Sequence, residues 1–106
     1  MNEEARLYEI IEHEVLSCED VSRFEEATLT EKMLSGGRAG SGIKISDDDD
    51  EMIITLNIIV YYGVNIPQLC YDIQVKVRRA VSDAAGVNVK AVNINVDGID
   101  KRPEIS

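Results

Sequence analysis

The sequence has no tryptophan, one histidine, two cysteines and only 5% aromatic residues. It also lacks any apolar run of the roughly 18 residues that a membrane-spanning helix needs, because Thr55 and Asn57 interrupt the longest run, "MIITLNIIVYY". The start, "MNEEARLYEI", has neither the basic nor the apolar region of a secretory signal. Cys18 and Cys70 lie in separate segments, so this composition predicts a cytoplasmic protein with reduced thiols.

Positive charge is scarce as well. Eleven Lys and Arg residues face 20 Asp and Glu residues, which gives a formal net charge of −9. The acid is concentrated in residues 1–35, with ten acids and three bases, and in the run "DDDDE" at 47–51. Residues 52–106 hold five acids and six bases. This balance argues against general nucleic-acid binding, which needs clustered Lys and Arg, and against direct attachment to an anionic membrane.

The first part of the chain has a helical pattern. Over residues 3–18 the apolar side chains recur at spacings of three and four, namely Leu7, Ile11, Val15 and Cys18. Residues 21–24, "VSRF", read as a short extended piece. The capping pattern from Thr28 to Glu31 predicts a short helix over 28–37, and residues 36–42 read as a flexible, glycine-rich linker.

Two strands are predicted next, over 42–46 and 52–62, around the acidic turn. Alternation in the longer strand gives one uniformly apolar face, predicted to face the core: Met52, Ile54, Leu56, Ile58, Val60 and Tyr62. The other face is mixed: Ile53, Thr55, Asn57, Ile59 and Tyr61.

A second helix is predicted to begin after Asn65 or Ile66, because Pro67 suits the first helical turn, and to end at Gly86. Its apolar stripe is Ile66, Leu69, Cys70, Ile73, Val77, Ala80, Val81 and Ala84. A last strand is predicted over 92–96. The tail from 97 has no pattern, so we expect it to be frayed, above all over 100–106.

These elements predict one α+β domain spanning residues 1–106. A helix between two strands allows them to lie parallel. The expected architecture therefore has two layers, a small mixed β-sheet with helices packed on one face, in the order α-(α)-β-β-α-β.

The second half of the chain resembles the alkaline-shock protein family of bacterial envelope-stress proteins, most clearly over residues 43–99. The family pattern is an apolar strand ending in Tyr-Gly, an Ile-Pro helix start, Gln and Val-Lys within the helix, Gly-Val at its end, and a Val-Asn-Val type strand. Its counterparts here are Tyr62-Gly63, Ile66-Pro67, Gln74 with Val75-Lys76, Gly86-Val87 and Val92-Asn93-Ile94.

The resemblance implies a non-catalytic cytoplasmic protein that uses no cofactor. Some relatives self-associate and are recruited to the inner face of the membrane by a membrane-anchored partner, and others are implicated in controlling lipid synthesis. The resemblance implies no catalytic residue.

Three motifs offer other functions. The acidic run 47–51 has the ligand type of a Ca²⁺ or Mg²⁺ site but not the spacing of an EF-hand, so we predict no metal site. Cys70 and His13 are the residues of a hypothetical thiol enzyme. "GRAG" at 37–40 has the form of a KH loop, which with the basic helix defines an alternative RNA-binding function.

The interpretation that fits the acidity is an interaction module that forms homo-oligomers and binds a protein partner, without nucleic acid or membrane insertion. The candidate partner surface consists of Ile53, Ile59, Tyr61, Lys76, Arg78 and Arg79. The first three would form an apolar patch if helices cover only the other sheet face. The cations would supply complementary charge, although cations in the second half of a helix also favour its negative end.

Overall fold

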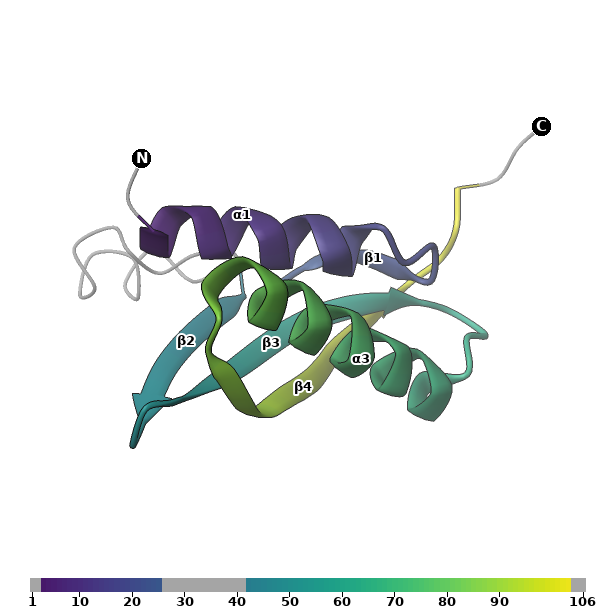
Figure 1. Ribbon diagram of the computed structural model, residues 1–106. Coiled ribbons are helices and arrows are strands. Elements are labelled where there is room, and N and C mark those ends of the chain that lie inside the picture. Colours follow the sequence, from purple (N-terminus) through teal and green to yellow (C-terminus); the bar gives the residue numbers. More distant parts are fainter. Residues whose placement is uncertain (1–2, 26–41, 104–106) are drawn as a thin grey trace, which may run out of the picture.

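The computed structural model describes residues 3–25 and 42–103. Its elements are, in chain order, α1 (Glu3–Leu16), β1 (Val21–Phe24), β2 (Ile43–Asp48), β3 (Glu51–Tyr61), α3 (Ile66–Ala85) and β4 (Asn88–Asp100). Figure 1 shows α1 and α3 side by side on one face of a single sheet. The predicted two-layer α+β fold is therefore confirmed.

The sheet is built around β3. On one edge, β4 pairs with β3 in parallel along its whole length. On the other edge, β2 pairs antiparallel with the first half of β3, from Asp48 opposite Glu51 to Ile43 opposite Leu56. β1 pairs antiparallel with the last part, where Phe24 lies opposite Ile58. The sheet is mixed, as predicted, because the connection through α3 returns the chain in the direction of β3.

The core lies between the sheet and the two helices. It takes the predicted apolar face of β3, whose members Ile54, Leu56, Ile58 and Val60 are fully buried. The core also contains the predicted N-terminal stripe, with Leu7, Ile11 and Val15 on α1 and Cys18 just after it. From α3 it contains Leu69, Ile73, Val77 and Val81. Tyr62 was predicted on this face but is 76% exposed, because β3 ends at Tyr61 and the chain turns away.

The ends of α3 follow the sequence signals. The Asn65 side chain accepts a hydrogen bond from the Gln68 backbone N–H at 3.1 Å, and a proline occupies the first turn. Gly86 ends the helix in the left-handed conformation and donates its N–H to the Ser82 carbonyl at 2.9 Å. The last turn contains no basic residue, so the helix dipole does not account for the cations of this helix.

β4 is longer than the predicted strand over 92–96. It begins at Asn88 and runs to Asp100, so the expectation of a patternless tail from 97 onwards is wrong for 97–100. The Tyr62 N–H donates to the Asp100 carbonyl at 2.8 Å, which holds this end against β3. The predicted helix over 28–37 lies outside the described residues, as does the linker 36–42 except for Gly42.

Candidate partner-binding surfaces

The sheet face opposite the helices carries the three apolar candidates from β3. Ile53 and Tyr61 are half-buried, whereas Ile59 is only 6% exposed although it lies outside the main core. Ile59 is flanked by Arg23 of β1 and Gly98 of β4, and a Cβ atom on Gly98 would come within 2.9 Å of its side chain. Ile59 therefore offers little surface to a partner.

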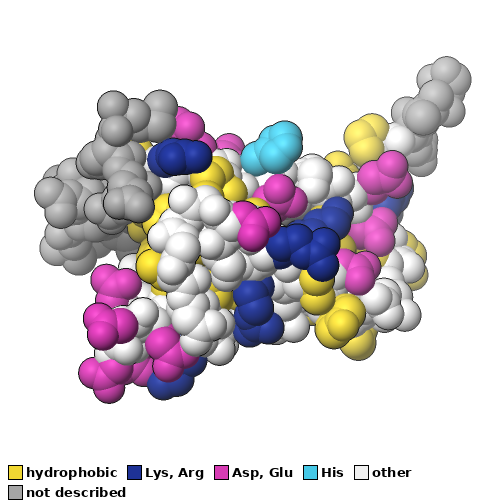
Figure 2. Space-filling model, in the orientation of Figure 1, with side chains coloured by type: hydrophobic (Ala, Val, Ile, Leu, Met, Phe, Trp, Pro, Cys, Tyr) yellow, Lys and Arg dark blue, Asp and Glu magenta, His cyan; other side chains and the backbone are white. Residues whose placement is uncertain are grey.

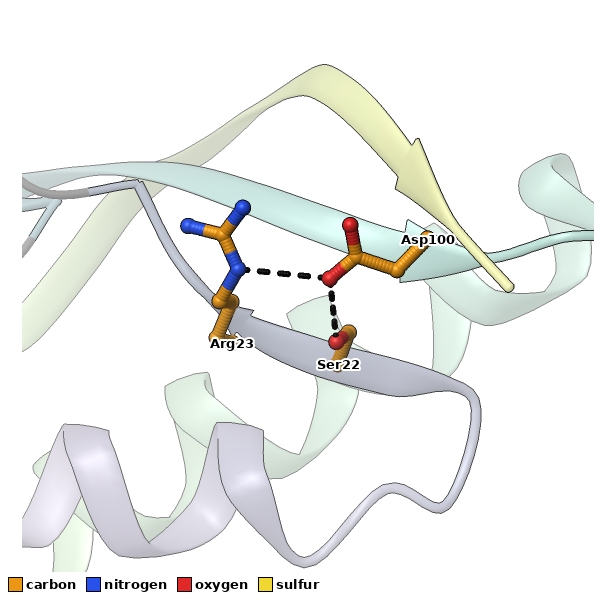
Figure 3. Close-up of polar contacts among 3 residues, drawn as sticks. All are labelled: Ser22, Arg23 and Asp100. Atoms are coloured by element: carbon orange, nitrogen blue, oxygen red, sulfur yellow. Dashed lines mark hydrogen bonds and ion pairs between the residues drawn. The ribbon is translucent and has the colours of Figure 1, made fainter. Parts of the chain in front are cut away.

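Polar side chains span β3 at this end of the open face (Figure 3). The Asp100 carboxylate of β4 accepts a hydrogen bond from the Ser22 hydroxyl at 2.7 Å and pairs with the Arg23 guanidinium at 3.2 Å. The shift in register between Val21 and Arg23 is an irregularity of the β-bulge type, which lets neighbouring side chains share one face. This cluster links the first strand of the chain to the last one across β3.

Arg102 makes a second set of contacts beside the Ser22–Arg23–Asp100 cluster. Its guanidinium lies 4.5 Å from the centre of the Tyr61 ring and pairs with the Asp20 carboxylate at 2.8 Å. Tyr61 is therefore stacked within the molecule. Further along the same face, the Asn95 amide donates to the Asn57 side-chain oxygen at 2.8 Å. The open face is thus more polar than the pattern of β3 alone indicates.

The pKa of the Asp100 carboxyl lies below its ordinary value. The main cause is the hydrogen bond from Ser22, which favours the ionised form, and Arg23 adds a hydrogen bond and its positive charge, while partial desolvation opposes the shift. Because the pKa is depressed in the folded state, the carboxylate stabilises the fold above its unfolded pKa. This contribution is lost as the pH falls through the folded value.

We expect Ser22→Ala to raise the pKa of Asp100 toward its ordinary value while the fold is retained, because the largest cause of the shift is removed and Arg23 remains. An NMR titration of the side-chain carboxyl resonances measures this. An unchanged Asp100 titration in the variant would show that Ser22 does not hold this carboxylate in solution.

The three basic candidates all lie on α3, but they do not form one cluster. Lys76 and Arg79 line a groove of about 580 Å³ between α3 and the end of α1, together with Leu69, Tyr71, Glu19 and Asp20. Arg78 does not line this groove. Lys76 Nζ lies 3.8 Å from Cys18 Sγ, which fixes the cation at the α1 side of the groove. The structure therefore groups two of the three cations and places the third elsewhere.

These three cations are available to a partner. Within residues 3–25 and 42–103, Lys76, Arg78 and Arg79 form no ion pair, and all three are exposed. Figure 2 shows Lys and Arg side chains in the middle of the face that carries the helices, with acidic side chains beside them and more acid at the tip of the β2–β3 hairpin. The neighbouring Tyr71 is 62% exposed. Tyrosine and arginine are both enriched at protein-binding surfaces, and Tyr71 and Arg79 line the same groove.

The residues of the hypothetical enzyme are not brought together. His13 is exposed on α1, and across the described residues its side chain shares no hydrogen bond with Cys70. Cys70 is half-buried rather than buried, and burial raises the pKa of its thiol, which disfavours the reactive thiolate. The structure thus offers no activated nucleophile at either residue.

The acidic hairpin tip is partly neutralised by its neighbours. Asp48 pairs with Lys90 at 2.6 Å, and Glu51 accepts a hydrogen bond from the Asn88 amide at 2.6 Å. In the part of the chain that the structure describes, no three potential metal ligands lie close enough to hold one ion. The GRAG motif at 37–40 lies outside the described residues.

The strand–helix–strand order from β3 to β4, with the signals at Tyr62-Gly63, Asn65 and Gly86 in their expected structural roles, matches a known family. Residues 4–101 match the alkaline shock protein 23 (ASP23) family, which is described as having a cell envelope-related function. The chain belongs to this family. The resemblance seen in the sequence is thereby confirmed.

Curated members of the alkaline-shock family match over shorter stretches. The uncharacterized protein Spy1535 of Streptococcus pyogenes serotype M6 is 41% identical over 69 residues, covering 61% of this chain and 53% of that protein. The uncharacterized protein YloU of Bacillus subtilis is 33% identical over 58 residues, covering 55% and 48%. The chain spans about half the length of the curated relatives it matches. No solved structure matches it.

Neither α1 nor α3 is long and apolar enough to cross a membrane, as judged over the described residues.

Proposed function

We propose that this protein is a non-catalytic interaction module of the bacterial envelope stress response, acting in the cytoplasm. It self-associates and binds a protein partner that is anchored in the membrane or is an enzyme of lipid synthesis. The cell envelope-related function of its family supports the setting. The observation that carries the proposal is the groove between α1 and α3, where the unpaired Lys76 and Arg79 flank an exposed tyrosine.

The chemistry of the groove indicates the kind of partner. Lys76 and Arg79 form no ion pair within the described residues and favour an acidic group of the partner beside them, and the Leu69 and Tyr71 side chains provide apolar contact area. Glu19 and Asp20 line the other side, where Arg102 pairs with Asp20 and donates to the Glu19 carbonyl. Asp72 of α3 also lines the groove, so the lining is mixed in charge, and Lys76 and Arg79 are the lining cations that form no ion pair among the described residues.

We expect Lys76→Glu combined with Arg79→Glu to leave the fold intact, since both residues are exposed on α3, and to weaken partner capture. The loss should be largest at low salt, because charge reversal mainly slows a steered association. The measurement is a pull-down from lysate of the source cell at two salt concentrations, with the captured proteins identified by mass spectrometry.

Arg78→Glu is the control, because it reverses a neighbouring exposed cation of the same helix that does not line the groove. Equal loss of capture in both variants would mean that net charge, rather than the groove, selects the partner. Capture that survives the double change would refute docking through the groove.

The RNA-binding alternative is tested by the same proteins in a gel-shift assay with random single-stranded RNA. We expect no retention by the parent at physiological salt, because a chain of net charge −9 repels a polyanion. Salt-sensitive retention of RNA by the parent that is lost in the double variant would favour the KH-like function instead.

A further inference from the structure

Some backbone N–H and carbonyl groups of β4 point away from β3, along the outer edge of the sheet. The hydrogen bonds of β3 show which residues these are. The Asn57 N–H and carbonyl bond to Gly42 and Glu25, on the edge that carries β1 and β2. Because backbone groups alternate along a strand, Ile54, Leu56 and Ile58 direct theirs toward β4. The parallel register of β3 and β4 then directs the backbone groups of Val92, Ile94 and Val96 away from β3, along the outer edge.

One of these outward groups already has a partner. The Gln74 side-chain amide of α3 donates to the Val92 carbonyl at 2.9 Å, as this direction requires. At the other end, the register shift between Ile58 and Ile59 leaves Asp97 as an extra residue in β4. Among the described residues no strand pairs with this edge, so Ile94 and Val96 expose their N–H and carbonyl groups between the two interruptions.

Natural edge strands are normally protected by charged side chains or proline. The segment 91–96, "AVNINV", contains neither. The Ile94 and Val96 side chains are only partly buried against the core, and Ile99 beyond them is 58% exposed. An unprotected edge with apolar side chains along it is a template for pairing with another strand.

The charges at the ends of this segment favour a second copy in antiparallel orientation. Lys90 and Asp100 at the two ends already pair with Asp48 and Arg23 of their own chain, whereas Asp97 forms no ion pair among the described residues. Parallel self-pairing in register would place the two Asp97 carboxylates together, and antiparallel pairing separates them.

We propose that two copies of this protein pair through the β4 edges about a two-fold axis at Asn95. Ile94 of each copy then exchanges backbone hydrogen bonds with Val96 of the other, and the two sheets become one. In this register the Val92 carbonyl takes no part in the exchange, so it keeps its hydrogen bond from the Gln74 side chain. The inference specifies the self-association within the proposed function and rests on it.

The register makes a specific demand on Asn95. Residues on the axis of such a pair lie directly opposite in the non-hydrogen-bonded arrangement, with Cα atoms roughly 4.5 Å apart. Asn95 is exposed, so Asn95→Asp and Asn95→Lys are both compatible with the fold. Each variant alone places two like charges opposite each other in the dimer. A mixture of the two variants places opposite charges there.

Sedimentation velocity of the parent should show concentration-dependent dimers, and each variant alone should dimerise about fivefold more weakly. The mixture should form a mixed dimer roughly thirtyfold tighter than either variant's own dimer, because repulsion is replaced by attraction. Ser46→Asp and Ser46→Lys are the matched controls, since Ser46 is exposed on the same face of β2, at the opposite edge. They should dimerise like the parent. Circular dichroism confirms that every variant is folded.

Two results would overturn the inference and are distinguishable. A parent that dimerises regardless of the charge at position 95, or that responds equally at position 46, self-associates through another surface. A parent that remains monomeric up to millimolar concentration does not self-associate by itself. In both cases the pull-down with the Lys76→Glu, Arg79→Glu variant still tests partner binding through the groove, because it does not depend on dimerisation.

Discussion

Ile73→Asp should abolish the cooperative unfolding transition of this protein. Ile73 is fully buried on the face of α3 that meets the sheet. The substitution removes the packing of an isoleucine and places a carboxylate where no described residue provides a polar partner. The combined cost exceeds about 4 kcal/mol, which is comparable to the lower end of the roughly 5–15 kcal/mol that stabilises a small domain.

Circular dichroism and thermal melting measure this effect. Tyr71→Asp is the matched control, because it introduces the same carboxylate two residues earlier on the same helix, at a side chain that is 62% exposed. The control should melt within a few degrees of the parent. If Ile73→Asp also melts there, the buried face of α3 has been assigned wrongly.

Gly42→Ala should be the second most damaging change. Gly42 has φ of +79°, and its carbonyl accepts the Asn57 N–H at 2.7 Å. A Cβ atom here would overlap the Asn57 carbonyl oxygen and lie 2.9 Å from the Glu25 carbonyl oxygen. All of these atoms are backbone atoms where β1 and β2 meet along β3, so relief of the overlap must disturb strand pairing. We expect a loss of about 3 kcal/mol or more.

Gly63→Ala isolates the steric part of that loss. Gly63 has a similar φ of +86°, but no atom lies within 4 Å of its added Cβ. Its substitution should cost only the backbone strain, about 1–2 kcal/mol. Urea unfolding of both variants gives the comparison. Equal losses would mean that the chain relaxes freely around Gly42.

The candidate surfaces could be predicted only in part. The exposed cations of α3 follow from their positions off the apolar stripe, and the structure finds all three exposed. The grouping of Lys76 and Arg79 in the groove without Arg78 depends on where α1 packs, which no local pattern encodes. Ile59 was expected in an open apolar patch, but Arg23 and Gly98 flank it from strands far away in the sequence.

The sequence by itself determined the elements whose signals are local. The alternation of β3 fixed its core face, and the stripe of α3 with Asn65 and Gly86 at its ends fixed that helix, because side-chain periodicity and caps act within one element. The tertiary structure decided what depends on neighbours. β4 extends to Asp100 because β3 supplies hydrogen-bond partners along its whole length. The contact of Ser22 with Asp100 joins residues 78 positions apart, and only the folded sheet brings them together.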